Sequence, residues 1–302
     1  MKVSISQVSI AALILCLSSG QALATTDLPD CQSSTASGTL CQIKVKDLHP
    51  TQFAVGSVAV ECKRKKIEKK HEKDKLEKYL ADPERQVPAV VGPDGNLYIT
   101  DHHHLTTALY RAKDGDWKGK DQKVQVNILE NFGETGISME EFWNIMKMQT
   151  RVWPYDEKGD AVEEYGEKLP SMDMGDLKDN PYRTLSRWTR ESCGYIKEGK
   201  EQCLALEATK EDPTAPYYME FYWARFLREE LKKSNADLDD PKKLMEDIYP
   251  EAIQVTLDKE KTGAFFKEQG LDAQKYGQNQ KGRYLSLSFS DDACEEWYLE
   301  KD

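Results

Sequence analysis

Histidine is scarce in this chain of 302 residues, which has only five, and lysine and arginine (42) are fewer than aspartate and glutamate (53). The net charge is −11. Phosphate backbones repel an acidic protein unless its basic residues cluster, so non-specific nucleic-acid binding is not favoured. The chain also lacks a CxxC zinc pattern, an internal repeat and, beyond its first residues, an apolar run long enough to span a membrane.

The first 24 residues have the pattern of a secretory signal peptide. Lys2 precedes an apolar run over residues 8–17, and Ala22 and Ala24 stand in A-x-A spacing. We therefore expect cleavage after Ala24 and a secreted or periplasmic protein of 278 residues. Loss of Lys2 changes the net charge to −12, with 41 basic against 53 acidic residues.

The cysteines agree with an oxidising compartment. Of the seven, one leaves with the signal, and an even number in an exported chain indicates disulfides. Pairing the first with the second and the fourth with the fifth of the six remaining cysteines closes a short polar loop each time. The third and the sixth are then left to join the two ends of the chain. The predicted bonds are Cys31–Cys41, Cys193–Cys203 and Cys62–Cys294, with free thiols as the alternative for some of these cysteines.

Hydrophobic periodicity divides the mature chain into an α/β unit and a mainly helical part, which predicts an α+β fold. Residues 25–40 are small and polar, typical of a mobile lead-in. Residues 41–135 contain three predicted strand regions, ending at Asp47, over 87–100 as a hairpin and over 124–128, together with helices before 80 and after 101. Residues 136–302 contain helices that begin with a Ser138–Glu141 capping box or with an Asn180 cap, followed by a late strand or extended segment at 284–289.

Three of the five histidines stand in a row, in "LYITDHHHLTTALYRA" over residues 97–112. The row lies between a predicted strand and a predicted helix. The first N–H groups of a helix have no intrahelical acceptor and the dipole is positive there, so this junction suits a phosphate or a carboxylate. Asp101 is placed to cap the helix or to orient an imidazole.

A divalent metal held by all three histidines is disfavoured. Consecutive helical residues project about 100° apart, so three neighbours cannot reach one ion while helical. If the first residues stayed extended, His102 and His104 would share a side, and Asp101 or His49 would have to complete the site. The sequence therefore names no cofactor, although it allows a divalent metal.

Acid–base chemistry fits the row better. Histidine changes its charge near neutral pH, and a nearby carboxylate raises its pKa. We predict His103 as general base or acid, with His102 beside it and Asp101 as its orienter. The alternative is that one histidine packs in the core while the others face solvent.

Several motifs in the same order resemble one family. "LHPTQFAVG", "PAVVGPDGNLYITDHHHLTTAL", "EFWNIM", "PYDEKG", "NPYRTLSRWTRESCGY" and "FYWARFLRE" look like the ParB-like putative nuclease family, the D-H-H-H-L branch of the ParB and sulfiredoxin superfamily. The resemblance runs from about Lys46 to about Glu230.

The resemblance implies a phosphate pocket at the strand-to-helix junction. Asp101 and the three histidines would line it, and Asp47, His49, Pro50 and Gln52 would approach from the end of the first strand. No cysteine stands in the row, which argues against sulfiredoxin chemistry. Leu105 replaces the arginines that follow the motif in ParB and sulfiredoxin, so the motif lacks their charged phosphate grip.

Three functions follow. The first is an exported phosphodiesterase or nuclease acting on a small anionic or phosphate-containing ligand. The second is a non-catalytic nucleotide- or anion-binding module, favoured by the acidic balance. The third, a nucleotide-dependent small-molecule kinase, requires that the signal is not cleaved. Trp143, Trp153 and Tyr155 are candidates for a lid or for the core.

Overall fold

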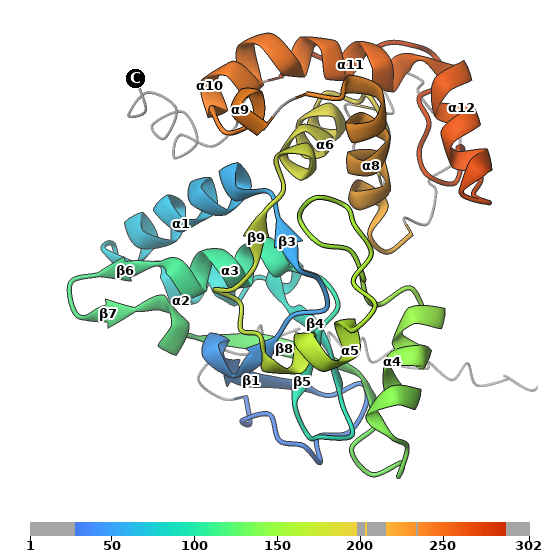
Figure 1. Cartoon of the computed structure of the whole chain (residues 1–302). Coiled ribbons are helices and arrows are strands. Elements are labelled where there is room, and N and C mark those ends of the chain that lie inside the picture. Colours follow the sequence, from blue (N-terminus) through green and yellow to red (C-terminus); the bar gives the residue numbers. More distant parts are fainter. Residues whose placement is uncertain (1–27, 198–202, 204–215, 234, 288–302) are drawn as a thin grey trace, which may run out of the picture.

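The computed structural model describes residues 28–197, 203, 216–233 and 235–287 (Figure 1). It has the predicted α+β fold, built on a five-stranded mixed sheet in the order β1–β8–β4–β5–β2. These strands are β1 Leu40–Lys44, β2 Leu48–His49, β4 Val87–Val91, β5 Leu97–Ile99 and β8 Lys123–Asn131.

The strand pairings confirm the predicted hairpin. β4 and β5 run antiparallel on either side of the glycine-rich turn, while β2 pairs with β5 and β4 with β8 in parallel. The first strand region differs from the prediction, because β1 ends at Lys44. The Val45 N–H donates to the Gln122 carbonyl, and a 3-10 turn over Val45–Asp47 redirects the chain into β2.

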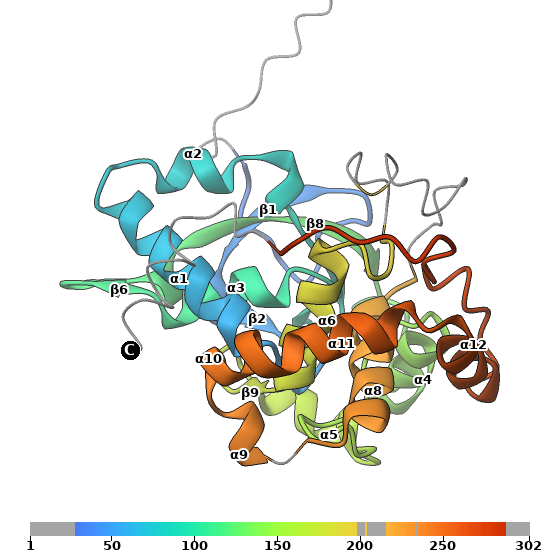
Figure 2. The ribbon, with the colours of Figure 1, turned by 90° about the horizontal axis from the view of Figure 1, so that it is seen from above.

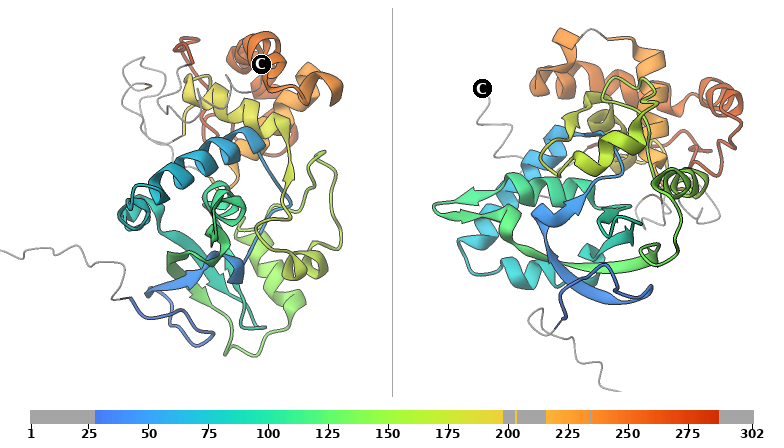
Figure 3. Two further views of the ribbon diagram at one scale, coloured as in Figure 1. Left: turned by 90° about the vertical axis from the view of Figure 1, so that its left-hand side faces the viewer. Right: turned by 60° about the horizontal axis from the view of Figure 1, so that its bottom comes forward.

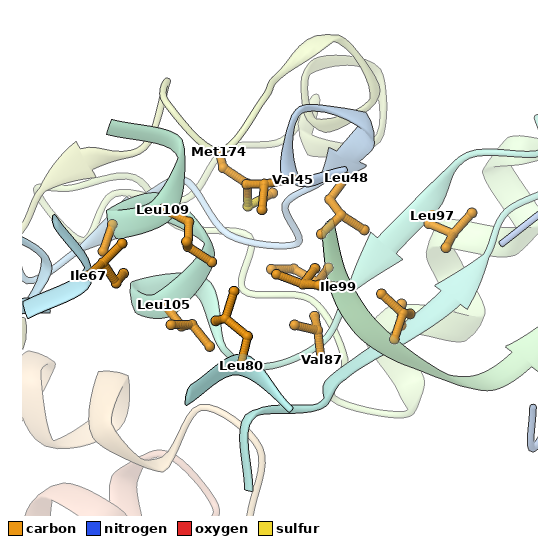
Figure 4. Close-up of a cluster of buried hydrophobic side chains, with 14 of the residues drawn as sticks. Val45, Leu48, Ile67, Leu80, Val87, Leu97, Ile99, Leu105, Leu109 and Met174 are labelled. Atoms are coloured by element: carbon orange, nitrogen blue, oxygen red, sulfur yellow. The ribbon is translucent and has the colours of Figure 1, made fainter. Parts of the chain in front are cut away.

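One face of the sheet is covered by α1 (Ser57–His71) and α3 (His103–Arg111) (Figures 1 and 3). Alternate strand residues point to opposite faces, so Ala89, Val91 and Leu97 all reach this side. Figure 4 shows how side chains from strands, helices and a distant loop meet here, with Val45, Leu48, Ile67, Leu80, Val87, Leu97, Ile99, Leu105, Leu109 and Met174 labelled.

The opposite face is covered by α4 (Met139–Met148). Val90 and Tyr98, which alternate with the residues of the first face, pack against Phe142 and Trp143. The predicted capping box is confirmed: the Ser138 hydroxyl accepts the Glu141 N–H at 3.2 Å, and the Glu141 carboxylate accepts the Ser138 N–H at 2.8 Å. Because both faces are covered, β4 is an almost continuous buried run.

The second large core belongs to the helices after residue 180. α6 (Pro181–Glu191) begins at the predicted Asn180 cap, and α8 (Met219–Leu231) is apolar on most of its circumference. α11 (Tyr249–Leu257) lies across both, as Figure 2 shows. Trp223 is fully buried at the centre, between Tyr195 and Phe266.

The remaining elements are short. Residues 283–287 form no strand, and Phe289, part of the same predicted segment, lies outside the described residues. The other helices and strands are α2 Leu76–Leu80, α5 Tyr165–Lys168, α9 Asn235–Leu238, α10 Pro241–Lys243, a π-helical turn Leu244–Ile248, α12 Lys259–Glu268, β3 Ala54–Val55, β6 Lys113–Asp114, β7 Trp117–Lys118 and β9 Lys178–Asp179.

Two of the predicted disulfides are present, Cys31–Cys41 and Cys193–Cys203. These bonds fit a protein that folds outside the cytoplasm. The third predicted pair includes Cys294, which lies outside the described residues, as does the predicted signal peptide. Among the helices that the structure describes, none combines the length and the apolar character needed to cross a membrane.

Candidate anion-binding site

The histidine row occupies the turn between β5 and α3. His102 is the N-cap of α3 in a left-handed conformation (φ 64°), and the helix proper begins at His103. The Asp101 carboxylate accepts the N–H of His102 at 2.6 Å. Asp101 therefore stabilises the turn that precedes the helix and does not cap the helix itself. Among the described residues no hydrogen bond joins this carboxylate to an imidazole.

His103 is buried, with 3% of its surface exposed. Its Nε2 accepts the backbone N–H of Thr51 at 3.2 Å. The Thr51 hydroxyl donates to the Ile99 carbonyl at 2.6 Å and lies 2.7 Å from the Tyr218 hydroxyl. The imidazole is thus anchored to the segment that follows β2, on the neighbouring edge of the sheet.

His104 is anchored in the same way. Its Nε2 accepts the backbone N–H of Gly56 at 3.1 Å. Gly56 leads into α1, and a Cβ at this position would lie 2.7 Å from the Thr184 hydroxyl on α6. Only glycine fits this crossing without displacement, so the chain can bring α1, α3 and α6 together around His104.

Burial keeps all three imidazoles neutral. It is the main cause that lowers the pKa of His103 to about 3, with the Asp101 carboxylate acting against it and His102 and Arg183 adding to it. Burial likewise lowers the pKa of His104 well below its ordinary value, reinforced by Arg183 and other cations. The pKa of His102 is also lowered, again mainly by burial. At neutral pH these rings can donate and accept hydrogen bonds but carry no charge.

A cavity of about 370 Å³ opens in front of the row and is called the histidine cavity here. Its walls come from β4, from the segments that follow β2 and β5, from the start of α3, from α6 and α8, and from the segments after α6 and before α8. They are formed by Gln52, Pro88, Thr100, Asp101, His103, His104, Arg183, Lys197, Pro216, Tyr217, Tyr218, Glu220 and Phe221.

Arg183 is the buried cation of this cavity, with 7% of its surface exposed. Its Nε and Nη1 have no hydrogen-bond partner in the part of the chain that the structure describes. Nη2 lies 3.6 Å from the Glu220 carboxylate, and the guanidinium lies 5.4 Å from the centre of the Phe221 ring. It costs free energy to leave the N–H donors of a buried charged group without acceptors, so this guanidinium is suited to an anionic ligand.

Glu220 organises the cations around it. Its Oε1 contacts Arg190 Nη1, lies 3.2 Å from Lys197 Nζ and faces Arg183. Burial by itself would raise the pKa of Glu220, but the three cations outweigh it and hold that pKa well below the ordinary value. Arg190 is also paired with Glu191, at 2.8 Å, whereas Arg183 and Lys197 line the histidine cavity together with the carboxylates of Asp101 and Glu220.

The predicted site residues divide into two groups. Gln52, Asp101, His103 and His104 share the histidine cavity. His102, His49 and Asp47 do not line it. His49 donates from Nδ1 to the Met172 carbonyl at 3.0 Å and packs near Tyr98, while Asp47 is exposed at the end of its 3-10 turn.

The aromatic candidates are placed as follows. Trp143 and Trp153 are 3% and 4% exposed and belong to the core. Trp153 stacks on Phe221, so it supports one wall of the histidine cavity from behind, and Tyr155 packs against Trp153. No group of three histidine, cysteine or acidic side chains within the described ranges is arranged to hold a metal ion.

The cations were missed at the level of sequence, although a signal exists. Arg183, Arg187 and Arg190 recur at i, i+4 and i+7 in a helix that otherwise buries one face. A cationic stripe at this spacing lies along one side of a helix. The absence of arginine after the histidine row concerned only the motif itself, because Arg183 and Lys197 reach the histidine cavity from elsewhere in the chain.

The structure is that of an α+β protein in which His103 and His104 of the histidine row line a cavity at a strand-to-helix junction. A family model described as putative ParB-like nuclease matches residues 41–229, and the chain belongs to this family. Among solved structures it is similar to protein Atu1540 from Agrobacterium tumefaciens, with a TM-score of 0.53 and 27% identity, over 74% of this chain and 94% of that one. No curated protein matches the chain.

Proposed function

We propose that this protein is exported and binds a phosphate-bearing ligand in the histidine cavity. The observation that carries the proposal is Arg183, which lines that cavity and whose buried guanidinium has two nitrogens, Nε and Nη1, without a hydrogen-bond partner among the described residues. A planar guanidinium matches two phosphate oxygens at once. Lys197 adds a second charge, and His103 and His104 add neutral donors. The signal pattern and the disulfides support export.

The reaction that we propose is hydrolysis of a phosphodiester. Water attacks phosphorus, its proton passes to the Asp101 carboxylate, and the bond to the leaving oxygen breaks, with solvent supplying the proton to that oxygen. Arg183 and the two imidazoles would stabilise the charge that grows on the phosphoryl oxygens. The family description, a putative nuclease, supports this class of reaction.

The test compares two arginines. Hydrolysis of bis(p-nitrophenyl) phosphate and of short single-stranded oligonucleotides is measured for the wild type, for Arg183→Met and for Arg64→Met. Arg64 lies on α1, is paired with Glu61 and Glu68, and is outside the histidine cavity, so it is the matched control. We expect at least a hundredfold loss of activity for Arg183→Met and less than a twofold change for Arg64→Met. Equal activity in all three proteins would remove the site.

A second function, binding of a small anion without turnover, is favoured by one observation. The pKa values of His103 and His104 are lowered far from neutrality, so neither ring is an efficient proton carrier at pH 7. Titration calorimetry with inorganic phosphate, done beside the hydrolysis assay, separates the two functions. Saturable binding that Arg183→Met abolishes, together with no hydrolysis, supports the binding module.

Export has its own test. N-terminal sequencing of the protein recovered from the medium or periplasm of an expressing bacterium should begin at Thr25. A chain that remains in the cytoplasm with Met1 in place would contradict export and would leave anion binding to be judged by calorimetry alone.

A further inference from the structure

We infer that the backbone N–H groups of Thr51 and Gly56 fix the tautomer of both cavity histidines, so that His103 and His104 meet a ligand as neutral Nδ1–H donors. The inference about the ligand rests on the proposed function, whereas the tautomer itself can be measured in the empty protein. Thr51 and Gly56 are therefore positioning residues, which act on the ligand through the two imidazoles.

The tautomer of His103 follows from the hydrogen bonds of Thr51. The Thr51 hydroxyl donates to the Ile99 carbonyl, so this hydroxyl accepts from the Tyr218 hydroxyl and has no hydrogen to offer the ring. The donor to Nε2 is then the Thr51 N–H, at 3.2 Å. The Thr51 hydroxyl oxygen also lies 3.3 Å from Nε2 and could accept a proton from it. A proton on Nε2 would nevertheless point at the amide hydrogen of Thr51 and leave this buried N–H without an acceptor.

The tautomer of His104 follows from a single hydrogen bond. Gly56 N–H donates to Nε2 at 3.1 Å. A neutral imidazole carries one proton, so a ring whose Nε2 accepts must carry that proton on Nδ1. Both rings line the histidine cavity. Nδ1–H is then the group of each ring that remains for a ligand.

One short segment supplies both anchors and is itself held from the other side. β3, between Thr51 and Gly56, pairs with β9, and the Asn180 N–H donates to the Val55 carbonyl at 2.8 Å. Asn180 is the cap from which α6 begins, three residues before Arg183. The two imidazoles and the guanidinium are therefore positioned by the same stretch of backbone. This arrangement favours a fixed spacing of hydrogen-bond donors around one anion.

The cations around the two rings lower the pKa of each imidazole, whereas the carboxylates raise it. Asp101, His102 and Arg183 face His103, while Arg183, Arg187, Lys63 and Glu220 face His104. Cations outnumber carboxylates here, and together with burial they oppose protonation. Binding of phosphate to the wild type should therefore take up no proton through these rings between pH 6 and pH 8.

The first experiment measures the tautomers directly. Nitrogen NMR on the full chain labelled with ¹⁵N-histidine should show, for His103 and His104, a protonated Nδ1 and an unprotonated Nε2 throughout pH 5–8. His71, which is partly exposed on α1, gives a reference imidazole signal in the same spectrum. A proton on Nε2 in either ring, or a charged ring in this range, overturns the inference whether or not the protein binds phosphate.

The second experiment separates the two nitrogens of His104. Asparagine places its amide near the position of Nδ1, whereas glutamine places its amide near Nε2. His104→Asn should keep phosphate affinity within about threefold of the wild type, whereas His104→Gln should lose about tenfold, the value of one hydrogen bond to a charged group. The opposite order in phosphate calorimetry overturns the inference, and no binding by the wild type contradicts the proposed function but not the tautomers.

Thr51→Val is the matched control for His103. It removes the hydroxyl but retains the backbone N–H, so the Nδ1–H tautomer should persist. If this variant moves the proton of His103 to Nε2, the hydroxyl and not the backbone sets the tautomer, and the inference fails for this ring.

Discussion

The two sides of the histidine cavity differ in how they are built. The sheet side contributes the start of α3, whose imidazoles are neutral and are held by backbone N–H groups. The helical side contributes Arg183, Lys197 and Glu220, which are charged and are held by one another. In the proposed function, the charged helical side would attract the anion and the neutral sheet side would orient it.

The largest expected loss of stability follows from removal of the Glu220 carboxylate on the helical side. Glu220→Ala leaves three cations close together without their shared counter-charge, and we expect the free energy of unfolding to fall by about 3–5 kcal/mol. Chemical denaturation measures this. Glu230→Ala, which removes a more exposed partner of Lys261, should cost no more than about 1 kcal/mol. Similar losses in the two variants would show that the cation cluster does not depend on Glu220.

The sheet side should respond to pH. The pKa of His103 is about 3 in the folded protein, against about 6.5 in an unfolded chain, so the unfolded chain binds a proton first as the pH falls. His103 therefore favours the folded state less and less from about pH 6.5 downward, by about 1.4 kcal/mol per pH unit.

Denaturation at pH 7 and pH 5 tests this dependence. The replacement His103→Gln should reduce the decline in stability between the two values by about 2 kcal/mol, which is His103's own part of it over this range. His49, outside the histidine cavity, is the matched site, and His49→Gln tests whether any loss of a histidine has the same effect. If the decline in the free energy of unfolding is the same in His103→Gln as in the wild type, the pKa of His103 is not lowered in the folded protein.

The two disulfides offer a matched pair across the comparison, since each joins cysteines ten residues apart. By loop-closure entropy, each should contribute about 2–3 kcal/mol to the free energy of unfolding. Their effects on the ligand should differ, because Lys197 lies within the loop closed by Cys193 and Cys203. Cys193→Ser with Cys203→Ser should weaken phosphate binding severalfold, whereas Cys31→Ser with Cys41→Ser should not change it. Equal affinities would place Lys197 outside the binding event.

The smallest expected effect concerns His102, which belongs to the histidine row but does not line the histidine cavity. A left-handed residue is less strained as glycine, so His102→Gly should raise the free energy of unfolding or leave it within about 1 kcal/mol. Phosphate affinity should stay within twofold, since His102 does not line the histidine cavity. A tenfold loss of affinity would return His102 to the binding machinery.

Local patterns predicted much of the fold. The β4–β5 hairpin, α3, and the caps at Ser138 and Asn180 are confirmed, because alternation, turn residues and capping act within a few residues of one another. The prediction ends the first strand at Asp47, whereas β1 ends at Lys44. Its alternation continues through Val45, but a backbone bond to Gln122, far along the chain, ends the pairing earlier.

The change from extended to helical periodicity is enough to place the histidine row at a strand-to-helix junction. The environment of each histidine depends on residues that are far from it in the chain. Thr51 and Gly56 take up one nitrogen of His103 and of His104, and burial keeps those rings neutral. In the proposed function, the charge for an anion comes from Arg183, about eighty residues later in the chain. Packing of α6 against α1 and α8 brings Arg183 to this cavity, and no local spacing in the sequence records that contact.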